Sequence, residues 1–230
     1  MPTVLVTGAN RGLGLEFARQ YAAAGWTVHA TCRQPEAADA LRALAEASPD
    51  KVRVHPLNVT DHARVDALAE ELAGEAIDVL LNNAGAFGNR AGFGSSDYSV
   101  WERTVWTNTF GPMKLAEAFV EHVARSERKV IANVTSKMGS IADNTSGSYY
   151  IYRSTKAALN MITKSMAIDL APRGIRTVVL HPGWVKTDMG GPSAPLDPPE
   201  SVAGMRRVID GLSAETSGSF FDYSGAEVPW

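Results

Sequence analysis

Tyr152 and Lys156 are the residues whose types and spacing most directly suggest chemistry. They lie near the start of a segment, 152–171, in which apolar residues recur at helical spacing. Residues four positions apart share one face of a helix, so the phenol and the ammonium group point the same way. A free phenol has a pKa of about 10, and a cation within about 4–6 Å favours phenolate. The pair could be an acid–base group, although packing plus a solvated charge explains one such pair considered alone.

The elements that must position this pair alternate between short β-rich runs and longer helical patterns. Strands are predicted at 3–7, 27–32, 52–56, 77–82, 129–135 and 175–182. Helices are predicted at 12–24, 36–47, 61–73, 98–125 and 152–171. Several strands lack polar alternation, as expected for strands buried on both faces of a parallel sheet. The pattern predicts an α/β fold with a single Rossmann-type, doubly wound parallel β-sheet flanked by helices, forming one domain over 1–230.

Three longer irregular segments, 83–97, 136–150 and 183–199, each follow a predicted strand. In doubly wound sheets, ligands bind outside the carboxyl ends of the strands. We therefore expect these segments to border a site, with 136–150 and 183–199 acting as substrate loops of the same domain.

Composition excludes several classes of function. The net charge of −3 offers no basic field for nucleic acid or acidic membranes, and the sequence has no apolar run of 18 residues. The start "MPTVLVTG" lacks a basic region before a cleavable apolar stretch, and Cys32 has no cysteine partner, so we expect a cytoplasmic protein. The five histidines show no metal-binding spacing, and no metal site is predicted.

A glycine-rich turn joins the first strand to the first helix in "VTGANRGLGLEF". Gly8, Gly12 and Gly14 permit a tight turn and close backbone approach, and the following helix directs free N–H groups at a phosphate. The spacing is G-x-x-x-G-x-G, whereas the usual dinucleotide pattern is G-x-G-x-x-G.

That variant and the motifs after it resemble the short-chain dehydrogenase/reductase family over nearly the whole chain. The matching motifs, in family order, are "TGANRGLG", "NNAG" (82–85), "WTNTFG", "NVTSKMGS", "YRSTK" and "HPGWVKTDMG" (181–190). The residues of the motifs "YRSTKAALN" and "HPGWVKTDMGG", together with the final Trp, look closest to the C-factor/sniffer-like carbonyl reductase branch.

The resemblance implies a catalytic set of Asn108, Ser136, Tyr152 and Lys156. Tyr152 would donate its proton to a carbonyl oxygen as hydride arrives from the nicotinamide, and Ser136 would hydrogen-bond the same oxygen. Lys156 would also bind the nicotinamide ribose, and Asn108 would bend its helix to hold a water in the proton relay.

The implied cofactor site spans the glycine turn and the ends of several strands. Its predicted residues are Gly8, Asn10, Arg11, Gly12, Leu13, Gly14, Arg33, Asn58, Val59, Asn83, Ala84, Gly85, Tyr152, Lys156, Pro182, Gly183, Val185 and Thr187. Asn58 replaces the Asp that the family commonly has, but its amide oxygen can still accept from the adenine amino group.

The cofactor is predicted to be NADP(H). An NAD-selective site commonly has an acidic residue at the end of the second strand, whereas this chain has "ATCRQPE", with no acid before Glu36. Arg33 and Arg11 could flank a 2′-phosphate. The alternative is that both are exposed surface arginines.

The spacing of the catalytic residues departs from the family. Ser136 precedes Tyr152 by 16 positions, a few more than usual, which enlarges the loop between them. Other serines in that loop could serve instead, namely Ser140, Ser146 and Ser148, but only Ser136 directly follows the fifth strand. Tyr149 and Tyr150 compete as the acid, but neither has a lysine four residues later.

The expected substrate contacts are Ser136, Met138, Tyr152 and Trp184. Other apolar loop residues, namely Phe87, Phe93 and Met189, could line the same pocket, and core packing explains any one of them equally well. The expected function is NADP(H)-dependent reduction of a ketone, aldehyde or quinone carbonyl. The alternative is a non-catalytic dinucleotide-binding regulatory protein on the same fold.

The long helices at 98–125 and 152–171 are apolar over much of their surface. The family pairs these helices between subunits, so the resemblance implies a homodimer or homotetramer. The helices could instead be covered within the monomer.

Overall fold

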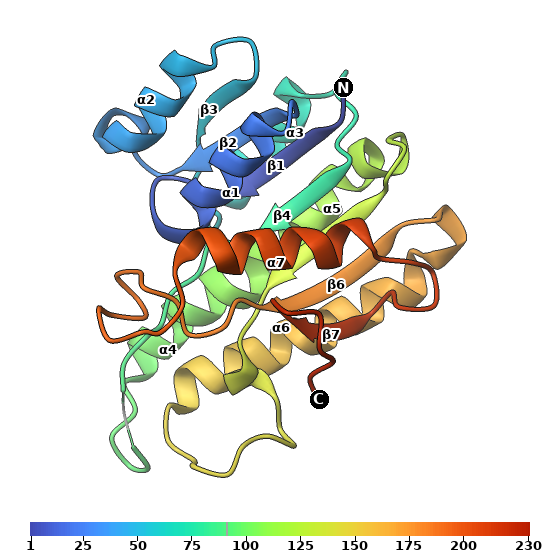
Figure 1. The fold of residues 1–230 in the computed structure, drawn as a ribbon. Helices are drawn as coiled ribbons and strands as arrows, with labels where there is room; N and C mark the ends of the chain where they lie inside the picture. The colour runs from blue at the N-terminus through green and yellow to red at the C-terminus, as the bar shows by residue number, and fades with distance from the viewer. Residues whose placement is uncertain (91) are drawn as a thin grey trace.

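The computed structural model describes residues 1–90 and 92–230; Ala91, in the irregular segment 83–97, lies outside the described residues. At its centre is a seven-stranded sheet in the order β3-β2-β1-β4-β5-β6-β7 (Figure 1). Every neighbouring pair of strands is parallel. The strands are β1 (Thr3–Thr7), β2 (Thr27–Cys32), β3 (Val52–Pro56), β4 (Val79–Asn82), β5 (Val130–Val134), β6 (Arg176–His181) and β7 (Ser219–Asp222).

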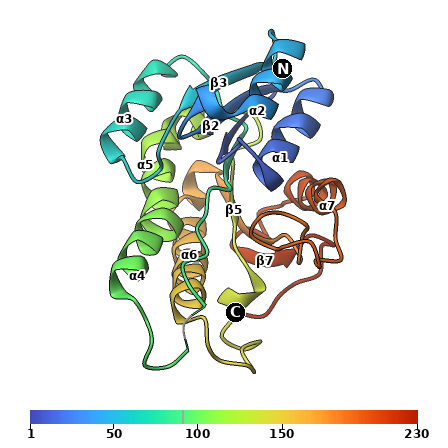
Figure 2. The same cartoon turned by 90° about the vertical axis from the view of Figure 1, so that its left-hand side faces the viewer.

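Helices cover both faces of the sheet, which Figure 2 shows nearly edge-on. One layer holds α1 (Gly12–Ala23), α2 (Asp39–Ala47) and α7 (Pro198–Asp210), and its core packs on β-strand residues such as Val4, Val6 and Val28. The other layer holds α3 (His62–Glu71), α4 (Tyr98–Val105), α5 (Gly111–Ala124) and α6 (Tyr150–Asp169). Every residue of β1, β4 and β5 is buried, which explains why the strand sequences lack polar alternation. The predicted doubly wound α/β fold is confirmed.

Two elements near the carboxyl end of the chain were not predicted from the sequence. α7 begins at Pro198 and Pro199. Proline suits the first turn of a helix because the N–H groups of that turn have no acceptor within the helix. β7 has only four residues and pairs with β6 from Val178–Ser219 to His181–Asp222. So short a run carries no clear periodicity, and its identity as a strand comes from the neighbour that it extends.

The predicted helix 98–125 is two helices joined by a π-helical turn, Trp106–Phe110. Thr104 donates its hydroxyl to Val100 O at 2.7 Å, and Thr107 donates to Arg103 O at 3.1 Å. Asn108 lies inside the π turn and is fully buried. Because π turns widen a helix locally, this one redirects the Asn108 side chain toward α6.

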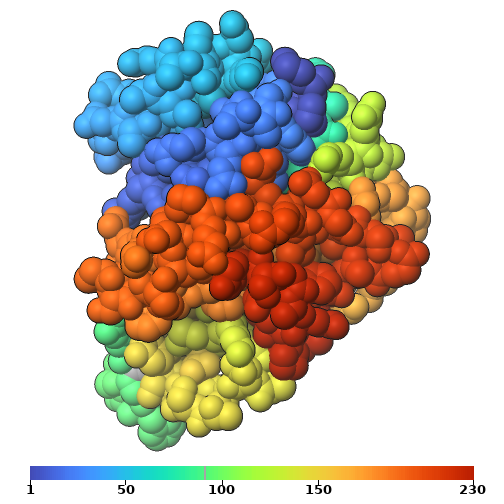
Figure 3. Space-filling model, in the orientation of Figure 1, coloured from blue at the N-terminus to red at the C-terminus, as the bar shows by residue number. Residues whose placement is uncertain are grey.

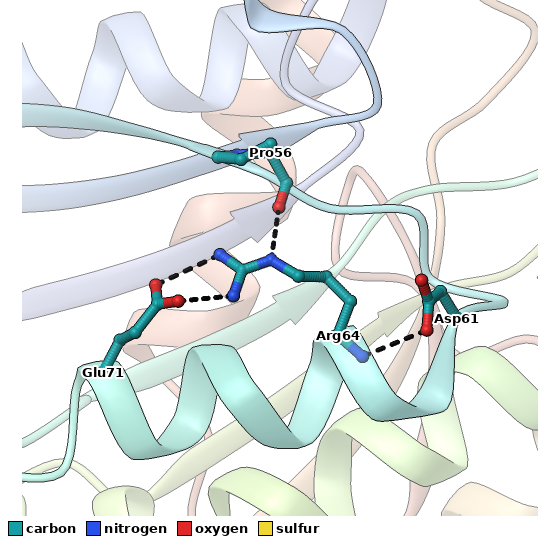
Figure 4. Close-up of polar contacts among 4 residues, drawn as sticks. All are labelled: Pro56, Asp61, Arg64 and Glu71. Atoms are coloured by element: carbon teal, nitrogen blue, oxygen red, sulfur yellow. Dashed lines mark hydrogen bonds and ion pairs between the residues drawn. The ribbon is translucent and has the colours of Figure 1, made fainter.

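The connection from β3 to α3, which carries Asn58 and Val59, is held by Arg64 (Figure 4). Asp61 caps the helix by accepting from the Arg64 amide at 3.0 Å. The Arg64 guanidinium bonds both carboxylate oxygens of Glu71, at 2.5 and 3.1 Å, and its Nε donates to Pro56 O at 3.1 Å. The bond to Pro56 O therefore ties the end of β3 to α3, and the bidentate pair with Glu71, which lies within α3, holds the guanidinium in place.

The segments that follow β4, β5 and β6 extend from the same edge of the sheet, toward the lower left of Figure 1. In the space-filling view the segment after β6 (orange) lies between the N-terminal part of the chain (blue) and the segment near 136–150 (yellow) (Figure 3). Within the described residues, no helix has the length and apolarity needed to cross a membrane.

Candidate active site

A cleft of about 690 Å³ opens at the carboxyl ends of the strands. Most predicted cofactor residues line it: Gly8, Asn10, Arg11, Gly12, Leu13, Gly14, Arg33, Asn58, Val59, Asn83, Ala84, Gly85, Tyr152, Lys156, Pro182 and Thr187. Gly183 and Val185 do not line the cleft. A Cβ on Gly183 would lie 2.8 Å from Leu196, and Val185 is buried in a bridge to Leu196, so both shape the segment after β6 from within.

The glycine turn closes tightly against the loop after β4. A Cβ on Gly14 would lie 2.2 Å from Gly8 O, and one on Gly8 would lie 3.0 Å from the Ala84 Cα. Asn83 ties the two loops together by donating its side-chain amide to Thr7 O at 2.8 Å. Among the residues that the structure describes, no side chain caps the start of α1. Its free N–H groups at the cleft, together with the close backbone, fit a dinucleotide phosphate.

Basic side chains border the same cleft. Arg33 lies at the end of β2 and is exposed, and no carboxylate is present in β2 itself. Arg11 pairs with Asp188 at 2.7 Å across the cleft, but both side chains are more than two-thirds exposed. Such a pair is held weakly, so Arg11 is available to a phosphate. Asn58 is exposed, and its side-chain oxygen accepts from the Thr60 amide at 3.3 Å.

Tyr152 and Lys156 lie buried at the end of the cleft, with 7% and 4% of their surface exposed. The Lys156 ammonium lies 5.8 Å from the centre of the Tyr152 ring and donates to Val134 O at 2.8 Å. Burial lowers the pKa of Lys156 to about 8. Burial also raises the pKa of Tyr152 to about 12, against the opposing effect of a hydrogen bond with Ser136. We expected the Lys156 cation to favour the phenolate form of Tyr152. Removal of the phenol from water has the larger effect, and it favours the protonated form.

Ser136 is the serine that the structure places against Tyr152. It is buried, lies two residues after the end of β5 at the start of a 3-10 turn (Lys137–Gly139), and accepts from the Met138 amide at 3.1 Å. Ser140 is turned to the Asp143 amide at 3.0 Å, and Ser146 accepts from Arg153 at 2.8 Å. Ser146 and Ser148 are exposed on the outer part of the loop.

Asn108 fastens the loop after β4 to α6. Its amide nitrogen donates to Ala86 O at 2.8 Å and to the Thr155 hydroxyl at 3.0 Å, and its oxygen accepts from the Ala86 amide at 2.8 Å. A Cβ on Gly85 would lie 3.5 Å from the Asn108 oxygen and 3.7 Å from the Lys156 ammonium. Asn108, Lys156 and the loop after β4 therefore meet at one point.

The substrate side of Tyr152 is aromatic and apolar. The Phe87 ring lies 4.7 Å from the Tyr152 ring and 5.9 Å from the Tyr149 ring. The Met189 sulfur lies 3.9 Å from the Tyr152 oxygen. The sequence indicated that Phe87 and Met189 could line the pocket, but core packing explained them equally well, so they were not among the expected substrate contacts. Trp184 is more than half exposed and donates its indole N–H to Gly190 O at 2.7 Å.

The comparisons define the class of protein. Residues 2–195 match the family model "short chain dehydrogenase". The chain therefore belongs to the short-chain dehydrogenase/reductase family, as the motif order predicted, and is an enzyme of that family.

Individual relatives place it within the family. It is 51% identical over 164 residues to the C-signal of Myxococcus xanthus, covering 71% of this chain and 99% of the relative. The carbonyl reductase Sniffer of D. melanogaster superposes with a TM-score of 0.96 at 35% identity, over 100% of both chains. An NADPH-bound carbonyl reductase from chicken fatty liver gives 0.94 at 36% identity, covering 100% of this chain and 99% of that one. The predicted resemblance to the C-factor/sniffer-like branch is confirmed.

Proposed function

We propose that this chain is an NADP(H)-dependent oxidoreductase that reduces a ketone, aldehyde or quinone carbonyl, with Tyr152 as the proton donor. The observation that carries the proposal is the buried Tyr152–Lys156 pair, with Ser136 beside the Tyr152 phenol, at the end of a cleft that fits a dinucleotide. A regulatory protein that only bound a dinucleotide would need the glycine turn but not the proton-transfer pair.

NADPH, when bound, supplies the hydride. The carbonyl oxygen accepts hydrogen bonds from Ser136 and Tyr152, which orient it and stabilise the negative charge that develops there. A pKa of about 12 keeps the Tyr152 phenol protonated at neutral pH, so it is ready to act as the acid. Lys156, with a pKa of about 8, is mostly charged at pH 7 and stabilises the phenolate as the proton leaves.

Asn108 has a positioning task in this proposal. Its bonds to Ala86 and Thr155 join the loop after β4 to α6, the helix that carries Tyr152 and Lys156. The water of the proton relay, which the family resemblance implies, would lie beside it.

The cofactor assignment rests on charge. Arg33 and Arg11 border the cleft where a 2′-phosphate would extend past the end of β2, and a planar guanidinium suits multi-oxygen anions. The NADPH-bound carbonyl reductase that superposes on this chain supports the same choice.

We further propose a homodimer or homotetramer in the cytoplasm. Apolar side chains are exposed along the layer of α4 and α6, including Tyr98 at 77%, Met161 at 67% and Ile168 at 66%. A second copy would cover them. Cys32 is a free thiol, which suits a reducing compartment.

The experiment that tests the function is a panel of ketones, aldehydes and quinones with NADPH oxidation as the readout. Tyr152→Phe should lower turnover by about 10²- to 10⁴-fold, the scale of general acid–base catalysis, and NADPH should still bind. Tyr150→Phe, on the same helix but half a turn away, is the control and should retain activity. Turnover unchanged by Tyr152→Phe contradicts the mechanism, and NADPH binding without turnover on any carbonyl supports the regulatory alternative.

A further inference from the structure

The side chain of Arg153 makes four hydrogen bonds to the enlarged segment between Ser136 and Tyr152. Its Nε donates to Gly147 O at 3.1 Å and to Ser148 O at 3.2 Å. One terminal nitrogen donates to Met138 O at 3.3 Å, and the other donates to the Ser146 hydroxyl at 2.8 Å. A single guanidinium thus bonds both ends of the segment, and its rigid fork suits several acceptors at once.

The segment needs such a fastening because its end is strained. Gly147, Ser148 and Tyr149 are consecutive residues with φ of 65°, 53° and 55°. Left-handed backbone is unfavourable for residues other than glycine, and such conformations persist only where the surroundings impose them. Two of the four Arg153 bonds go to carbonyls inside this strained turn.

The same guanidinium connects to the polar side of the candidate site. Arg153 bonds the carbonyl of Met138, and the amide of Met138 donates to the Ser136 oxygen at 3.1 Å. Ser136 in turn lies beside the phenol of Tyr152, close enough to lower its pKa. The position of Ser136 is therefore set through Met138.

The segment that Arg153 bonds also reaches the aromatic side of the candidate site. The strained turn ends at Tyr149, whose ring lies 5.9 Å from Phe87, and Phe87 lies 4.7 Å from the Tyr152 ring. A turn that relaxed would withdraw Tyr149 from this cluster and change the wall that faces a substrate.

We propose that Arg153 is a positioning residue for carbonyl reduction, which holds Ser136 and the Tyr149–Phe87 wall in register with Tyr152. Arg153 does not line the cofactor cleft, so its influence falls on the carbonyl substrate and not on the dinucleotide. This inference rests on the proposed reductase function.

The test compares Arg153→Met and Arg153→Lys with the parent enzyme. Arg153→Met should lower kcat/KM by about 10- to 100-fold, through a higher KM and a lower kcat, because small displacements of reacting groups are costly. The dissociation constant of NADPH should be unchanged. Arg153→Lys keeps the charge but cannot reach four acceptors, so it should recover only part of the loss and serves as the folded variant if Arg153→Met is unstable.

Arg125→Met is the matched control. Arg125 also donates to backbone carbonyls, to Glu121 O at 3.1 Å and to Ala73 O, but far from Ser136, where α5 meets the loop after α3. It should leave kcat/KM unchanged. Full kcat/KM in Arg153→Met, or a loss matched by an equal loss of NADPH affinity, overturns the positioning assignment.

Hydrogen exchange separates this proposal from the proposed function. In the parent protein the amides of 138–149 should be protected, and in Arg153→Met they should exchange faster, while those of α7 stay the same. That result does not depend on turnover. Slower or equal exchange in 138–149 overturns the fastening, whereas faster exchange in a protein with no carbonyl activity shows that only the reductase assignment has failed.

Discussion

Met189, on the segment that follows β6, places its sulfur 3.9 Å from the phenol oxygen of Tyr152. Met189 is nearly half exposed, and its side chain has several rotatable bonds. A carbonyl that accepts the Tyr152 proton must come within hydrogen-bonding distance of that oxygen. Met189 must therefore move aside or become part of the substrate pocket.

Shortening Met189 should change substrate preference. We expect Met189→Ala to raise kcat/KM for bulky ketones relative to small aldehydes by roughly tenfold or more, since one methylene in an apolar pocket already changes discrimination by about 10- to 200-fold. The two substrates measured on one variant control for losses in folding. An equal change for both sizes, or a fall for bulky ketones alone, contradicts a contact of Met189 with the substrate.

The pH dependence of reduction should follow Lys156. Reduction needs protonated Tyr152, whose pKa of about 12 leaves it protonated below that pH, and charged Lys156, whose pKa is about 8. Raising the pH therefore discharges Lys156 first, and kcat/KM for reduction should be level near pH 7 and fall above about pH 8.

Lys156→Arg provides the control for that assignment, because a guanidinium stays charged across the range. Its residual activity should lose the fall near pH 8 and decline only at higher pH. A pH profile that is the same in both proteins assigns the fall to another group.

The elements that carry the site could be predicted because each has a local signal. Gly8, Gly12 and Gly14 mark the turn, and the four-residue spacing of Tyr152 and Lys156 places them on one helix face. The raised pKa of Tyr152 could not be predicted, because it depends on burial by residues distant in the sequence, including Phe87 and Met189. β7 was missed for the same reason, since its partner β6 lies about 40 residues earlier and neither strand predicts the other.

The proposed homo-oligomer predicts a specific response to charge on α6. Met161→Asp places a carboxylate in the apolar surface that a second copy would cover, and burying it there is unfavourable. We expect light scattering to show a monomer for Met161→Asp and an oligomer for the parent. Ile141→Asp, at a residue that is 79% exposed in the segment after β5, is the control and should leave the mass unchanged. A monomeric parent protein excludes the oligomer.

Cofactor selectivity should depend on Arg33. An exposed guanidinium beside a 2′-phosphate contributes about 1–3 kcal/mol, so the parent enzyme should prefer NADPH over NADH by roughly tenfold to 100-fold. Arg33→Asp replaces attraction with repulsion and supplies an acceptor for a ribose 2′-hydroxyl, so the preference should vanish or invert.

The measurement is kcat/KM for both cofactors at low and high salt, because screening should weaken the NADPH preference while leaving NADH nearly unaffected. Arg42→Asp is the matched control: Arg42 lies on α2, pairs with Asp39 at 2.6 Å and does not line the cleft, so its loss should leave the preference intact. Asp188→Asn adds a second arm. It frees Arg11 from its 2.7 Å ion pair, and NADPH should then bind somewhat more tightly if Arg11 also reaches the phosphate. Equal use of both cofactors by the parent enzyme, or an unchanged preference in Arg33→Asp, would contradict the NADP(H) assignment.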